Sequence, residues 1–159
     1  MYVIGLAMFL AGGRFRSDKN ASMKYLLDSV KGDPLTGEGF TFLGHYYGEV
    51  ISGVQVDREK AIKCYTKALG IDPLDEEAGW GISELYMNEN NSEKALKLWV
   101  DITTLTGHAH WCYPLLGQYY MCHGEYEESV KSFQKALELQ PVNASCWHGL
   151  VSTHAYIYT

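Results

Sequence analysis

Apolar residues recur along this chain with the spacing of helices rather than strands. Two stripes show the i, i+3, i+7 pattern that places three side chains on one face of a helix. They are Phe40, Leu43 and Tyr47, followed by Tyr113, Leu116 and Tyr120. The pattern predicts an all-α protein.

Four columns of residues repeat with a period of 34. They are Pro73, Gly107 and Pro141; Ala61, Ala95 and Ser129; Tyr65, Trp99 and Phe133; and Ala68, Ile102 and Ala136. This period is typical of tetratricopeptide (TPR) repeats, each of which is a pair of antiparallel helices, A and B. The chain therefore resembles the TPR family, which implies an α-solenoid of antiparallel helix pairs that forms a right-handed superhelix.

Residue size within the columns predicts how the two helices of a repeat meet. Gly44 and Gly117 stand at the eighth position of helix A, where a missing side chain lets helix B approach closely, and Ser83 is the small substitute. Large aromatics such as Tyr65 and Phe133 are expected to fill the space between repeats.

Helix ends can also be predicted. Proline ends helix B at Pro73 and Pro141, because it lacks a backbone donor, and Gly107 is expected to do the same through left-handed geometry. Short polar residues that serve as N-caps stand at the expected starts: Asp75 and Asn143 for helices A, Asp57 and Ser92 for helices B.

The register divides the chain into successive repeats. We expect a partial unit at 1–34, complete units at 37–73 (with an enlarged A–B loop), 76–109 and 110–143, the start of another at 144–150, and an atypical tail at 151–159. In the first unit, Ile4-Gly5 take the Leu-Gly position, Leu26 takes the aromatic column and Pro34 closes the unit.

The ends of the chain suggest a piece of a longer solenoid. Neither end has the polar capping helix that solenoids use for solubility. Helical periodicity is expected to stop after Leu150, where β-branched and aromatic residues take over. Because Val151-Ser152 is how a splice donor would translate, read-through from an intron is one hypothesis for this tail.

Composition narrows the choice of partners. The formal net charge is -6 and the 13 Lys and Arg residues form no basic stripe, which argues against direct nucleic-acid binding. The apolar start, Met1 to Gly13, is too short to span a membrane. It lacks the basic n-region of a signal peptide, which is the minority interpretation. We expect no membrane association.

Metal and catalytic sites are not expected. His108, His110, Cys112, Cys122 and His123 invite a zinc hypothesis, but no Cys-x-x-Cys pair is present. Cys112 and Cys146 are 34 residues apart, so both fill the same helix A slot as small buried thiols. The acidic groups Asp75-Glu76-Glu77 and Glu127-Glu128 suit helix starts, and no nucleophile lies near them. We therefore expect no enzyme and no cofactor.

Protein binding is the remaining role, and TPR arrays use the concave surface of helices A for it. In this register the exposed concave positions are Glu38, Thr41, His45, Glu77, Trp80, Glu84, Trp111, Gln118 and Met121. The Lys and Asn carboxylate clamp of chaperone-binding TPR units is absent from them. An acidic tail would be repelled, so a partner with basic or apolar helical segments fits better.

One family resembles the chain more closely from residue 4 to residue 150. Leu43-Gly44-His45-Tyr46-Tyr47, a lengthened loop and then Cys64-Tyr65-x-Lys67-Ala68 are similar to the TPR scaffold subunits of superkiller (Ski) complexes. The Ile4-Gly5-Leu6, Ala95-Leu96 and Gly117-x-Tyr119-Tyr120 units follow the expected order.

This resemblance implies a cytoplasmic or also nuclear scaffold that holds an RNA helicase and WD40-repeat subunits together for exosome-mediated 3′→5′ mRNA decay. Two alternatives stay open. One is an unrelated TPR adaptor of the transport, cilia or co-chaperone type, and the other is the TPR arm of a larger enzyme.

Overall fold

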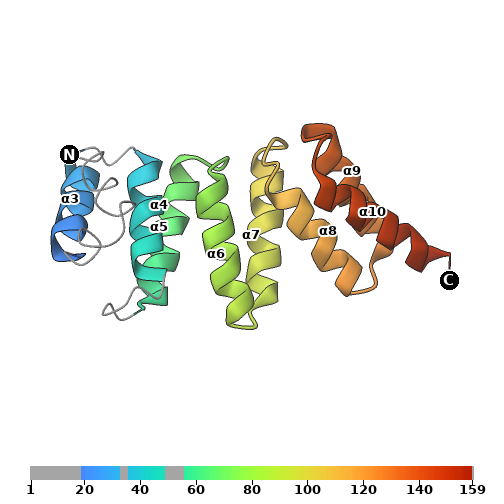
Figure 1. The fold of residues 1–159 in the computed structure, drawn as a ribbon, viewed down its shortest axis with the longest axis horizontal. Coiled ribbons are helices and arrows are strands. Elements are labelled where there is room, and N and C mark those ends of the chain that lie inside the picture. Colours follow the sequence, from blue (N-terminus) through green and yellow to red (C-terminus); the bar gives the residue numbers. More distant parts are fainter. Residues whose placement is uncertain (1–18, 33–35, 49–55, 159) are drawn as a thin grey trace. The chain divides into compact units, whose positions relative to one another are not determined.

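The computed structural model describes residues 19–32, 36–48 and 56–158 (Figure 1). These residues form helices and turns, with no strand in the ranges given, so the all-α prediction is confirmed. The helices are α3 (Lys19–Gly32), α4 (Gly37–Gly48), α5 (Arg58–Ile71), α6 (Glu76–Asn88), α7 (Ser92–Leu105), α8 (Cys112–Cys122), α9 (Tyr126–Leu139) and α10 (Ala144–Ile157). None of these helices is long and apolar enough to cross a membrane.

The chain divides into two compact units, an N-terminal unit of Met1–Leu85 and a C-terminal unit of Tyr86–Thr159. The predicted positions Ile4-Gly5 and Pro34 and most of the enlarged loop, residues 49–55, lie outside the described residues.

In the N-terminal unit, α4 packs against α5, and α3 packs against α4 (Figure 1). Tyr65 of α5 is buried between two glycines on different helices. A Cβ added to Gly44 would lie 2.4 Å from Tyr65 Cε1, and one added to Gly81 would lie 2.4 Å from Tyr65 Cζ. The ring therefore touches the backbones of both α4 and α6. Leu26 of α3 is fully buried, as its place in the aromatic column predicts.

The C-terminal unit uses the same arrangement around Phe133 of α9. A Cβ at Gly117 of α8 would lie 2.7 Å from Phe133 Cε1, and a Cβ at Gly149 of α10 would lie 2.4 Å from Phe133 Cζ. The small column residue Ser129 is buried beside it and donates a 2.9 Å hydrogen bond to the Gly117 carbonyl. Small residues thus let α8, α9 and α10 approach closely.

Three of the four predicted N-caps are confirmed. Asp57, Asp75 and Asn143 accept hydrogen bonds at 3.1, 3.0 and 3.2 Å from the backbone N–H groups of Lys60, Ala78 and Cys146. The prediction for Ser92 is wrong. The N-cap of α7 is Asn91, whose side chain makes no capping bond.

The helices B of the three complete repeats, α5, α7 and α9, end in the same way. The left-handed conformation predicted for Gly107 is wrong. The cap residues Asp72, Thr106 and Gln140 each donate a 2.8 Å backbone hydrogen bond to the carbonyl four residues earlier. Thr106 ends α7 in an extended conformation, with φ -141° and ψ 116°. Among the described glycines, only Gly124 is left-handed, with φ 76°.

The expected end of the last helix near Leu150 is also wrong. Helix α10 continues to Ile157, and Thr153 within it is fully buried. Its hydroxyl donates to the Gly149 carbonyl at 2.8 Å and lies 3.0 Å from the Ser129 hydroxyl on α9. Packing against α9 therefore overrides the weak helix propensity of the β-branched tail.

Candidate protein-binding face

On α4, the three predicted binding residues differ in how far solvent reaches them. Glu38 is exposed in the first turn, His45 is partly buried, and Thr41 is only 2% exposed. The prediction that Thr41 is exposed is therefore wrong. Its hydroxyl donates to Asp75 Oδ2 at 2.6 Å, while Asp75 Oδ1 caps α6. Thr41 ties one repeat to the start of the next, which is a structural role.

His45 also has a structural contact. Its Nδ1 lies 3.0 Å from the hydroxyl of Tyr65, and the two rings meet edge to face with centroids 5.4 Å apart. This hydrogen bond fixes the orientation of the Tyr65 ring between Gly44 and Gly81.

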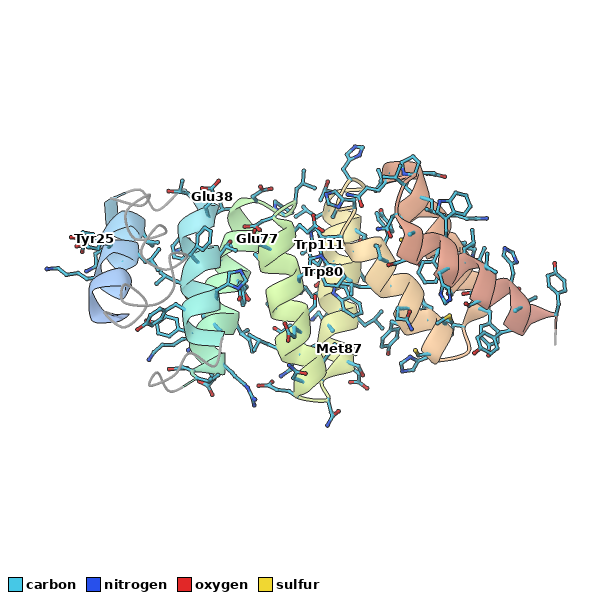
Figure 2. All side chains as sticks on the ribbon, in the orientation of Figure 1. Tyr25, Glu38, Glu77, Trp80, Met87 and Trp111 are labelled. Atoms are coloured by element: carbon cyan, nitrogen blue, oxygen red, sulfur yellow. The ribbon has the colours of Figure 1, made fainter. Side chains whose placement is uncertain are left out.

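Helix α6 supplies the most open part of the predicted face. Glu77, Trp80 and Glu84 are exposed and follow the i, i+3, i+7 spacing of one helix face. Glu77 and Trp80 are labelled in Figure 2. The Trp80 indole is 44% exposed, and its N–H donates to Glu76 Oε1 at 3.2 Å. In the described part of the chain, no ion pair neutralises these glutamates. We call Glu38, Glu77, Trp80 and Glu84 the acidic-indole face.

The three predicted residues of the C-terminal unit do not form a comparable face. Trp111 is 1% exposed and immediately precedes α8, so the prediction that it is exposed is wrong. Gln118 is exposed, and its amide donates to Cys122 Sγ at 3.5 Å, while Met121 is partly buried. Trp111 belongs to the core with its neighbours Ala109 and Cys112, which are both buried.

An aromatic group at the end of α8 was missed by the sequence reasoning. Tyr119 stacks on His123 with ring centroids 4.0 Å apart, and it meets Trp99 of α7 edge to face at 6.3 Å. His123 Nδ1 also lies 2.8 Å from the Tyr119 carbonyl. The i, i+4 spacing of Tyr119 and His123 was visible in the sequence, but the contact with α7 depends on the fold.

The thiols lie where the repeat predicts. Cys112 and Cys146 are fully buried, and burial raises the pKa of both thiols. Burial also raises the pKa of the partly buried Cys64. Among the described residues, no group of three His, Cys, Asp or Glu side chains is placed so that it could hold a metal ion.

Repeat register, paired helices and glycine-flanked aromatics together define a protein built from TPR units. Residues 57–73 and 115–141 match the tetratricopeptide repeat, so the chain contains TPR repeats. Human Superkiller complex protein 3 is 31% identical over 151 residues, or 94% of this chain and 9% of that protein. Superkiller protein 3 of Saccharomyces cerevisiae is 28% identical over 141 residues, or 81% of this chain and 9% of that protein. The chain thus spans about a tenth of these relatives.

Solved structures share the fold at low sequence identity. PilF of Pseudomonas aeruginosa has a TM-score of 0.68 at 16% identity, and the match covers 99% of this chain and 67% of the PilF chain. The first TPR of Spaghetti (RPAP3), bound to an HSP90 peptide, has a TM-score of 0.62 at 20% identity. That match covers 80% of this chain and 97% of the Spaghetti chain. Such TPR solenoids are generally non-catalytic, and with the superkiller relatives they indicate a protein-interaction scaffold.

Proposed function

We propose that this chain is part of the scaffold subunit of a Ski-type complex that assists exosome-mediated 3′→5′ mRNA decay in the cytoplasm. The observation that carries the proposal is the similarity to Superkiller complex protein 3, at 31% identity across 94% of the chain. The partners are then an RNA helicase and WD40-repeat subunits. The helicase then binds the RNA, which is compatible with the net charge of -6 on this chain.

Within that role, the acidic-indole face is the proposed contact with a partner protein. Trp80 offers a large, partly exposed ring, and the surrounding carboxylates have no neutralising ion pair in the described residues. A large aromatic side chain with polar or charged residues around it is typical of protein-binding surfaces. The face suits a helical segment with basic and apolar residues.

A co-chaperone role is less well supported. The peptide bound to the Spaghetti TPR, SRMEEVD, is acidic at its end. The exposed glutamates Glu38, Glu77 and Glu84 would repel such a peptide.

The test is affinity purification of the full-length protein from its own cells, followed by mass spectrometry of the recovered subunits. A Ski-type helicase and WD40 subunits are expected with the wild-type protein. Their absence would contradict the proposed complex.

A matched pair of variants then tests the acidic-indole face. Trp80→Ser is expected to lower recovery of at least one subunit, whereas Leu74→Ser is expected to change nothing. The pair is matched because both side chains are 44% exposed and both lie in the N-terminal unit. Equal recovery with both variants would eliminate the face as a contact and leave the scaffold role standing.

A further inference from the structure

A groove of about 620 Å³ lies between the start of α9 and the end of α10 in the C-terminal unit. Its lining includes Glu125, Tyr126, Glu127 and Glu128 on one side, with Tyr156 and Ile157 on the other. We call it the Tyr126–Tyr156 groove. Its two sides come from helices that pack against each other, so the fold fixes its shape.

Two tyrosine rings form the aromatic part of this groove. Tyr126 and Tyr156 are stacked, with ring centroids 5.6 Å apart and an angle of 10° between their planes. Tyr156 is nevertheless 57% exposed, so solvent reaches more than half of this side chain. Stacked, open aromatic rings suit a flat or cationic group, because the ring faces carry negative charge.

The charged part of the groove is uniformly negative. Glu125 and Glu127 form no ion pair with any residue that the structure describes. Glu128 alone is paired, with Lys131 Nζ at 2.6 Å, and no Lys or Arg lines the groove. The start of α9 would by itself favour an anion, but three carboxylates exclude one.

We infer that the Tyr126–Tyr156 groove binds an arginine side chain from a basic segment of a partner protein. A guanidinium is planar, so it can stack on a tyrosine face while its N–H groups donate to carboxylates. An acidic segment would be repelled. A purely apolar one would remove water from Glu125 and Glu127 without replacing their hydrogen bonds. The basic occupant is the one that satisfies both the rings and the carboxylates.

The inference is tested by fluorescence anisotropy with the 159-residue chain and a fluorescein-labelled peptide of alternating glycine and arginine. A twin peptide with citrulline in place of arginine keeps the shape and removes the charge. The arginine peptide is expected to bind and the citrulline twin is not. A lysine twin is expected to bind more weakly, because an ammonium group cannot stack.

Variants then locate the binding. The double variant Glu125→Gln/Glu127→Gln is expected to weaken binding roughly fivefold to tenfold. Its control is Glu89→Gln/Glu93→Gln, which makes the same charge change at exposed sites of the same unit and should leave affinity unchanged. Tyr156→Leu is expected to weaken binding about threefold, whereas Tyr158→Leu, outside the groove, is not. Circular dichroism checks that each variant is folded.

Three results would overturn the inference. One is equal loss in the two double variants, since that would mean attraction to the overall negative charge. The others are equal affinity for the arginine and citrulline peptides, and no binding of either. Because the titration needs no other subunit, its failure is distinguishable from failure of the proposed Ski-type assembly.

Discussion

At the scale of single residues, the packing of the Tyr65 and Phe133 rings depends on glycines on both sides of each ring. Tyr65 and Phe133 are large, yet each lies against two helix backbones, because Gly44, Gly81, Gly117 and Gly149 lack a Cβ. The Tyr65 ring has little freedom to move aside, since it lies between two helices and its hydroxyl is hydrogen-bonded to His45. An added methyl group must therefore displace a helix.

Two glycine-to-alanine substitutions in the N-terminal unit should have opposite effects. Gly44→Ala is expected to lower the free energy of unfolding by about 1–3 kcal/mol, because its Cβ would lie 2.4 Å from Tyr65 Cε1. Gly70→Ala is expected to raise it by about 0.5 kcal/mol, because nothing lies within 4 Å and alanine favours the helix. Urea denaturation followed by circular dichroism measures both. Equal effects would contradict the role of the ring.

Only part of this residue-level structure could be predicted. Gly44 and Gly117 fall in the expected position, but Gly81 and Gly149 were missed. These two glycines are 68 residues apart, which is two periods of 34. The position midway between them is Leu115, so the column does not consist of glycines throughout. The register also predicted that Thr41 and Trp111 are exposed, which is wrong, since both side chains are buried. A register gives the direction of a side chain and not the neighbour that covers it, such as Asp75 over Thr41.

At the scale of helices, local preference and packing disagree most at the end of α10. The residues after Leu150 are β-branched and aromatic, which predicts that the helix ends there. Cys146, Gly149 and Thr153 nevertheless share one buried face of α10, at i, i+3 and i+7. The contact with α9 supplies the stability that propensity lacks, and sequence alone does not reveal a contact between helices.

Two aspartate substitutions in α10 test whether the tail is part of the fold. Thr153→Asp is expected to lower the free energy of unfolding by about 3 kcal/mol or more, because it places a charge where the native side chain is 0% exposed. Val151→Asp, two residues earlier at 67% exposure, should change it by less than about 0.5 kcal/mol. Thermal unfolding of both variants would show the difference. A tail that does not pack would give two equal, small effects.

At the scale of the whole chain, what could be predicted is the architecture, and what could not is the surface. A period of 34 residues specifies paired helices because each helix needs a partner to bury its apolar stripe. The Tyr126–Tyr156 groove has no such periodic signal. The groove forms where the turn before α9 meets the end of α10, about 30 residues later in the chain. The sequence predicted that this last helix ends near Leu150, before the α10 residues that line the groove.

The four thiols are distributed along the chain and differ enough in burial to report on its fold. Cys122 is exposed, Cys64 is partly buried, and Cys112 and Cys146 are buried. Only the thiolate reacts with iodoacetamide, and burial both blocks access and raises the pKa of Cys64, Cys112 and Cys146. We expect Cys122 to be alkylated first, Cys64 more slowly, and the two buried thiols only when the protein unfolds.

Mass spectrometry of the labelled peptides over time, with a sample in urea as the control, measures the order of alkylation. Rapid labelling of Cys112 in the folded protein would contradict the burial of the start of α8, a helix that packs against α7, α9 and α10.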